Sequence, residues 1–145
     1  MNGLKTIQII HAGDADQHLG HLGVICERLQ TEKRITGYSR MSSTTVGTTS
    51  FSGLGEGDMV IMLLSDGMES KRASLERSLF DASSRQPLLK VVEILVDQVV
   101  FNPRFIVLPI DLRPIRLRRD MDATWFQIGR ELGNYFPTIQ EPIPS

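Results

Sequence analysis

Short apolar runs alternate with longer stretches of helical character along this chain. Residues 6–10 and 59–64 are almost continuously apolar, as expected for strands that are covered on both faces. Residues 35–39 predict a weaker strand, and residues 105–110 predict another buried one. These four runs are the strand signals of the chain, and residues 59–64 give the strongest of them.

Helical signals lie between and after these strands. Between the first two strands, leucines recur at helical spacing behind an aspartate that can cap a helix. Residues 69–84 are helical by composition, a further helix is predicted from Pro87 through Val100, and residues 122–135 are amphipathic. Residues 40–52 are rich in Ser, Thr and Gly without apolar periodicity, which predicts a long loop.

The predicted order is strand, helix, strand, loop, strand, helix, helix, strand, helix. This alternation favours an α/β fold, in which a parallel sheet of about four to five strands carries helices on both faces. The sequence shows no internal repeat and no domain boundary. We expect one domain over residues 1–137 and a loose tail over residues 138–145.

Composition narrows the class of protein. Charged residues make up 23% and hydrophobic residues 41% of the 145 residues, and the formal net charge is -1. Such a balance gives no general attraction for nucleic acid or anionic lipid, so we expect neither nucleic acid nor membrane as a partner. No signal-peptide pattern is visible, and Cys26 has no second cysteine to pair with, so we expect a cytoplasmic protein with this thiol in the core.

Several familiar site motifs are absent. The sequence contains no GxxxxGK[ST] phosphate loop, no GxGxxG turn and no GxSxG elbow. His18 and His21 have a spacing that can bind a metal, but no third ligand is evident nearby, so we expect no metal site and a solvated helix face. The basic run 113–119 favours a solvated loop, with docking of an acidic partner as the alternative.

A different set of residues carries a family pattern. The first strand leads into small and acidic residues over positions 11–16, and Val46-Gly47 lies in the loop after the second strand. Positions 56–65 read as an acidic residue, an apolar strand and a serine. The next helix carries a serine, a small residue and a glutamate at three-residue intervals, namely Ser70, Ala73 and Glu76.

This pattern resembles the Toll/interleukin-1 receptor (TIR) domains, especially the bacterial TIR-like ones, over about the first 76 residues. The resemblance implies a flavodoxin-like three-layer sandwich and a role in signalling or defence. In the enzymatic members, the glutamate matching Glu76 is the catalytic residue of an NAD glycohydrolase. NAD would then be a substrate, and no cofactor is implied.

The chemistry explains why a carboxylate is needed there. Breaking the nicotinamide–ribose bond develops positive charge on the ribose, which a nearby carboxylate stabilises. The leaving group is already cationic, so no general acid is required. The resemblance implies that the ligand would be surrounded by residues after the first, second and third strands and on the following helix: Ala12, Gly13, Asp14, Ser42, Val46, Gly47, Ser65 and Arg72.

The chain also departs from the family pattern. Arg72 replaces an aromatic residue, and an arginine favours phosphate or carboxylate over an aromatic ring. Val46 replaces the loop proline, and the stretch from Gly47 to Asp58 predicts a second helix that is short or missing. The alternative interpretation of Glu76 is a surface carboxylate paired with Arg72 one helical turn earlier.

Two other functions fit the same fold. The domain could be a non-catalytic module that associates with itself or with other TIR-like domains, in which case Glu76 is incidental. It could instead be a phospho-receiver domain, whose acidic pocket Asp14, Asp16 and Asp66 would resemble. A receiver needs a lysine after the last strand, and no lysine follows Ile110.

Overall fold

Five parallel strands form one sheet in the order β2-β1-β3-β4-β5. This is the flavodoxin-like order, and it confirms the predicted α/β fold. The strands are β1 (Thr6–His11), β2 (Gly37–Ser42), β3 (Met59–Leu64), β4 (Lys90–Leu95) and β5 (Ile106–Leu108). The computed structural model describes residues 5–44, 51, 54–55, 57–86, 88–101 and 104–136.

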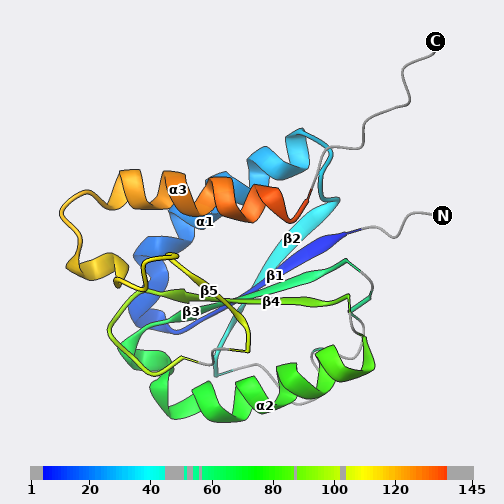
Figure 1. Cartoon of the computed structure of the whole chain (residues 1–145), viewed down its shortest axis with the longest axis horizontal. Coiled ribbons are helices and arrows are strands. Elements are labelled where there is room, and N and C mark those ends of the chain that lie inside the picture. Colours follow the sequence, from blue (N-terminus) through cyan, green and yellow to red (C-terminus); the bar gives the residue numbers. More distant parts are fainter. Residues whose placement is uncertain are drawn as a thin grey trace.

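Helices cover both faces of the sheet, which gives the three layers expected. Helices α1 (Asp16–Thr31) and α3 (Met121–Asn134) lie side by side on one face, and α2 (Glu69–Arg85) lies on the other (Figure 1). Short 3-10 turns follow the carboxyl ends of the strands, namely η1 (Gly13–Ala15), η2 (Asp66–Met68) and η3 (Ile115–Leu117).

Strand β3 shows how the core is divided. All six of its residues are buried, and they alternate between the two faces. Met59, Ile61 and Leu63 join the cluster under α1 and α3, while the side chains between them join the cluster under α2. Complete burial of side chains of this size stabilises the fold by about 1.5–3 kcal/mol each.

The prediction of a helix over residues 87–100 is wrong, because this segment contains β4. Its residues pair with β3 on one side, for example Val92 with Ile61, and with β5 on the other. Because β4 is buried on both faces, its apolar residues do not alternate with polar ones, so the sequence lacks the pattern that would separate this strand from a helix.

The other elements lie close to their predicted positions. Helices α2 and α3 confirm the predictions for residues 69–84 and 122–135. Strand β2 extends to Ser42, so the segment predicted as a loop from residue 40 begins later, and β5 ends at Leu108 rather than at residue 110. The predicted tail over residues 138–145 lies outside the described residues, as does most of the stretch in which a short second helix was considered.

The structure also shows the surroundings of the single cysteine and the character of the helices. Cys26 is fully buried in the core, and burial raises the pKa of its thiol to about 12, so the thiol stays protonated. Within the described part of the chain, no helix has the length and apolar character needed to cross a membrane.

Candidate functional site

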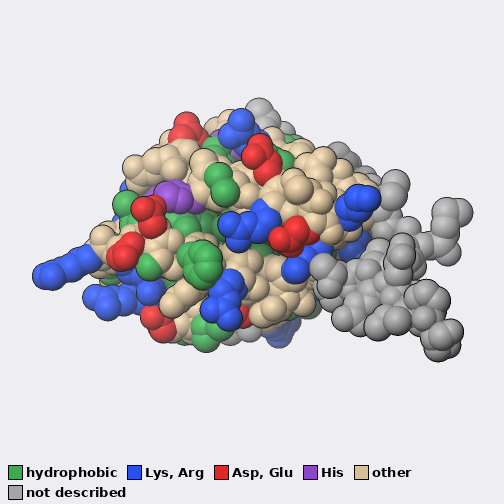
Figure 2. All heavy atoms as spheres, turned by 90° about the horizontal axis from the view of Figure 1, so that it is seen from above, with side chains coloured by type: hydrophobic (Ala, Val, Ile, Leu, Met, Phe, Trp, Pro, Cys, Tyr) green, Lys and Arg blue, Asp and Glu red, His purple; other side chains and the backbone are tan. Residues whose placement is uncertain are grey.

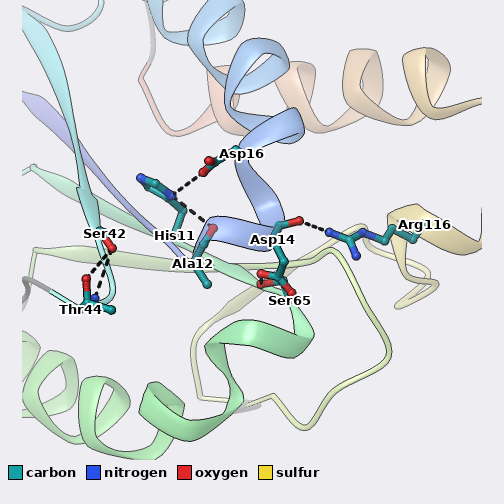
Figure 3. A network of polar contacts seen from close by, with 8 residues as sticks. All are labelled: His11, Ala12, Asp14, Asp16, Ser42, Thr44, Ser65 and Arg116. Carbon is teal, nitrogen blue, oxygen red and sulfur yellow. Dashed lines mark hydrogen bonds and ion pairs between the residues drawn. The ribbon is translucent and has the colours of Figure 1, made fainter.

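The first group of candidate residues lies where β1 and β3 end. The hydroxyl of Ser65 donates a hydrogen bond of 2.6 Å to Asp14 Oδ1. The backbone N–H of Gly67 donates one of 2.7 Å to Asp14 Oδ2. The two strands are neighbours and parallel, so their carboxyl ends place Asp14 and Ser65 together, as Figure 3 shows.

Asp14 is held as a carboxylate. Partial burial alone would raise the pKa of its carboxyl group, but the hydrogen bonds from Ser65 and Gly67 and the charge of Arg116 outweigh burial and lower it. Both carboxylate oxygens are occupied by donors from the β3 side of the edge. Asp14 therefore joins η1 to η2 and is suited to holding the loops of this edge.

Gly67 is required by this contact. A Cβ atom at this position would lie 2.6 Å from Asp14 Oδ1, which is closer than real contacts allow. The absence of a side chain lets the backbone N–H reach the carboxylate. This glycine is a packing requirement of the site, and the sequence motifs did not single it out.

A second ion pair extends the same edge. Arg116 Nε lies 3.4 Å from Asp97 Oδ1, and its guanidinium also donates to the backbone oxygen of Asp14 (Figure 3). Asp97 Oδ2 accepts a hydrogen bond of 2.8 Å from the N–H of Asp66. The loops after β1, β3 and β4 are thus tied to η3.

The basic run 113–119 is largely exposed, as expected of a solvated loop, but part of it is held in the edge. Arg116 bridges two loops, Arg118 pairs with Asp111, and Ile115 is fully buried. Asp97 was missed as a site residue because the segment that contains it was predicted as a helix, and Arg116 because it was assigned to the basic run. With β4 in place, Asp97 follows the carboxyl end of a central strand, which is the signal that could have found it.

The second group of candidate residues lies on α2. The side of this helix that faces the sheet carries residues at positions 72, 75, 76, 79 and 82. Glu76 is therefore turned inward and is only 8% exposed. The prediction that it pairs with Arg72 is confirmed, since Arg72 Nη1 lies 2.7 Å from Glu76 Oε1, but its description as a surface carboxylate is wrong.

The two oxygens of Glu76 have different surroundings. Oε1 accepts from Arg72, whereas Oε2 is buried and has no hydrogen-bond partner among the described residues. Arg72 is also held by Glu69, whose Oε1 lies 3.3 Å away at the more exposed side of the helix. A further carboxylate, Glu93 of β4, is fully buried in the same sheet.

The other predicted ligand residues that the structure describes lie at the ends of β1 and β2. Ala12 is buried, and Gly13 opens η1. Ser42 ends β2 and shares a hydrogen bond of 2.9 Å with Thr44, away from the Asp14–Ser65 pair in Figure 3. Val46 and Gly47 lie outside the described residues. The structure thus brings Asp14 to Ser65 and, separately, Arg72 to Glu76.

The histidines do not form a metal centre in the described part of the chain, where no three His, Cys, Asp or Glu side chains are placed to share an ion. His18 is almost fully buried, which corrects its placement on a solvated face. His21 stacks on Trp125 at 5.6 Å between ring centroids. Burial lowers the pKa of His18, and the nearby charge of Arg116 lowers it further.

The phospho-receiver alternative expects Asp14, Asp16 and Asp66 to resemble one acidic pocket. Asp14 is bonded to Ser65 and Gly67, Asp16 lies 3.3 Å from His11, and Asp66 contributes its backbone N–H to the edge. The three aspartates therefore have separate partners.

Comparisons with known proteins found no match. No protein-family model matches the chain, no curated protein matches it, and no solved structure matches it. The fold and the geometry of the two groups of residues are therefore the basis for a function.

Proposed function

We propose that this chain is a TIR-like signalling or defence domain that cleaves NAD at the nicotinamide–ribose bond, with Glu76 as its catalytic residue. The observation that carries the proposal is the buried oxygen Oε2 of Glu76, which has no hydrogen-bond partner among the described residues. An unsatisfied buried acceptor costs about 1–3 kcal/mol. A substrate hydroxyl group or developing positive charge would supply the missing partner.

The reaction needs little more than this carboxylate. The bond between ribose C1 and the nicotinamide nitrogen breaks, and its electron pair leaves with nicotinamide. The ribose becomes cationic, and the negative charge of Glu76 stabilises it until water adds. The products are ADP-ribose, nicotinamide and a proton.

The arrangement of the elements supports the family resemblance. The strand order is that of a flavodoxin-like sheet, and Glu76 lies on the helix that follows the central strand β3. The segment predicted as a helix from Pro87 through Val100 contains strand β4, which completes a sheet of five parallel strands. Asp14 and Ser65 meet at the carboxyl edge, where open α/β sheets bind their ligands.

The proposal is tested by nicotinamide release from NAD, at high protein concentration and with the chain fused to an oligomerising coiled coil. We expect Glu76→Ala and Glu76→Gln to lower the rate on the order of 100-fold or more, because the charge that stabilises the ribose cation is lost. Thermal unfolding of each variant checks that the fold survives.

Glu69→Gln is the matched control, because it removes a carboxylate from the same helix and from the same arginine. We expect its rate to stay within about twofold of the wild type, since Glu69 is half exposed and its pair with Arg72 is weak. Equal release from wild type and Glu76→Gln would overturn the assignment of Glu76.

Self-association is a second candidate function, favoured by an apolar surface between α1 and α3. Val24 and Phe126 are 59% and 60% exposed, and both border a hollow of about 190 Å³. Figure 2 shows this face, with hydrophobic side chains among charged ones. Arg28 and Asp122 border the same hollow, so a two-fold related copy would present opposite charges to each other.

Sedimentation tests this second candidate directly. We expect a concentration-dependent dimer of the wild type, and its loss in Phe126→Ser, because exposed apolar patches of this kind mark contacts between proteins. Leu88→Ser removes a similarly exposed side chain elsewhere and should leave the dimer intact. A wild type that remains monomeric at high concentration would contradict this function.

A further inference from the structure

We propose that Arg72 covers the carboxylate of Glu76 in the unliganded chain and transfers to the diphosphate of the substrate, which makes Arg72 the residue that selects nucleotides over nucleosides. This inference rests on the proposed function, because it concerns the substrate of that same site. It extends the proposal by naming the group that the substrate must carry.

The geometry shows the covered state. Arg72 Nη1 lies 2.7 Å from Glu76 Oε1, and the side chains are only 16% and 10% exposed, so water screens the pair weakly. A carboxylate whose charge is balanced by a guanidinium at this distance stabilises a ribose cation poorly. Glu76 is thus held in place but restrained as long as Arg72 remains on it.

The same arginine has a second partner. Glu69 holds the guanidinium from the exposed side of α2 at 3.3 Å, so the side chain lies between a buried and a half-exposed carboxylate. A diphosphate presents paired oxygens and two negative charges, which match the fork of a guanidinium better than a single carboxylate oxygen does. Transfer of Arg72 to the diphosphate leaves both oxygens of Glu76 available to the ribose.

Binding is measured first by calorimetric titration of the full chain, with ADP-ribose as the probe and adenosine as its uncharged counterpart. We expect ADP-ribose to bind and adenosine to bind far more weakly. Arg72→Gln should weaken ADP-ribose binding about tenfold or more, because a charge-assisted bidentate contact is lost. Lys71→Gln, the matched control, removes the neighbouring exposed cation and should change affinity less than about twofold.

The competition gives a second, opposite prediction. Glu76→Gln should tighten ADP-ribose binding several-fold, because the carboxylate that competes for Arg72 is removed. If instead Arg72 and Glu76 act only as a fixed pair, Glu76→Gln weakens binding, which would overturn the inference. Absence of ADP-ribose binding to the wild type, or unchanged affinity in Arg72→Gln, would also overturn it.

Activity separates this inference from the proposed function. We expect the kcat/KM ratio of NAD over nicotinamide riboside to fall about tenfold or more in Arg72→Gln, since only NAD carries the diphosphate. If no release depends on Glu76 while ADP-ribose binding follows the expected pattern, the proposed function fails and the binding role of Arg72 stands. If release depends on Glu76 while the ratio and the affinity ignore Arg72, only this inference fails.

Discussion

Two carboxylates of this fold, one at the carboxyl edge of the sheet and one on α2, differ in how many of their oxygens have hydrogen-bond partners. Asp14 uses both oxygens, one for Ser65 and one for Gly67, and so acts as a tie between loops. Glu76 uses one oxygen for Arg72 and leaves the other buried without a partner among the described residues. The first arrangement stabilises the edge, and the second leaves a buried acceptor unsatisfied within the part of the chain that the structure describes.

The tie at Asp14 makes Gly67 sensitive to substitution. Gly67→Ala should lower the free energy of unfolding by about 1–3 kcal/mol, because its Cβ would collide with the carboxylate. Gly20→Ala is the control, because Gly20 lies exposed in the middle of α1 and a Cβ atom there would meet nothing within 4 Å. That change should stabilise the helix by about 0.5–1 kcal/mol. Urea unfolding of both variants measures the difference, and equal effects would contradict the tie.

Burial of His18 predicts a pH dependence of stability. Burial and the charge of Arg116 lower its folded pKa below the ordinary value of 6.5, so the unfolded chain binds the proton more readily. The free energy of unfolding should therefore fall as the pH drops from above 6.5 through the folded pKa. His18→Leu removes this dependence.

Asp14 acts in a separate window. Its folded pKa is lowered, so the stability it contributes is present above the ordinary value of 3.8 and is lost as the pH falls below it. Urea unfolding between pH 7.5 and 5 thus reports His18 alone of the two. An unchanged slope in His18→Leu over this range would contradict the assignment.

At the scale of elements, the amphipathic and uninterrupted segments were predictable. Strand β3 and helix α3 follow directly from apolar runs and from helical periodicity. Strand β4 was not predictable in the same way, because its apolar residues serve two covered faces and show no period of their own. Because β4 was predicted as a helix, Asp97 was not recognised as a residue that follows the carboxyl end of a strand.

The inward position of Glu76 illustrates a different limit. The sequence placed it on the correct helix and beside the correct arginine. Its burial could not be predicted, because α2 has few apolar residues to mark its inner face and a carboxylate is an unusual residue there. Tertiary packing of α2 against the sheet decides which of its polar side chains are enclosed.

Strand β4 can be tested by substitution. Ile94→Ala should lower the free energy of unfolding by about 2–5 kcal/mol, because Ile94 is fully buried between β3 and β5. Leu88→Ala, just before the strand, removes a side chain that is 55% exposed and should change stability little. Similar small effects in chemical unfolding would contradict the enclosed strand.

At the scale of the whole molecule, the parallel order brings every strand's carboxyl end to one edge. That edge joins η1, η2 and η3 through Asp14, Asp97 and Arg116, while α2 presents Glu76 to the sheet beneath it. Helices α1 and α3 cover the other face of the sheet (Figure 1), and this face exposes apolar side chains such as Val24 and Phe126. Catalysis and association would therefore use different faces of the domain.

The most direct test of this account is nicotinamide release from NAD by the full chain, wild type beside Glu76→Gln. The account predicts release by the wild type and a loss on the order of 100-fold or more in the variant, under conditions in which thermal unfolding shows that the variant is folded. Release that is equal in both, or absent from the wild type even when the chain is fused to an oligomerising coiled coil, would contradict it.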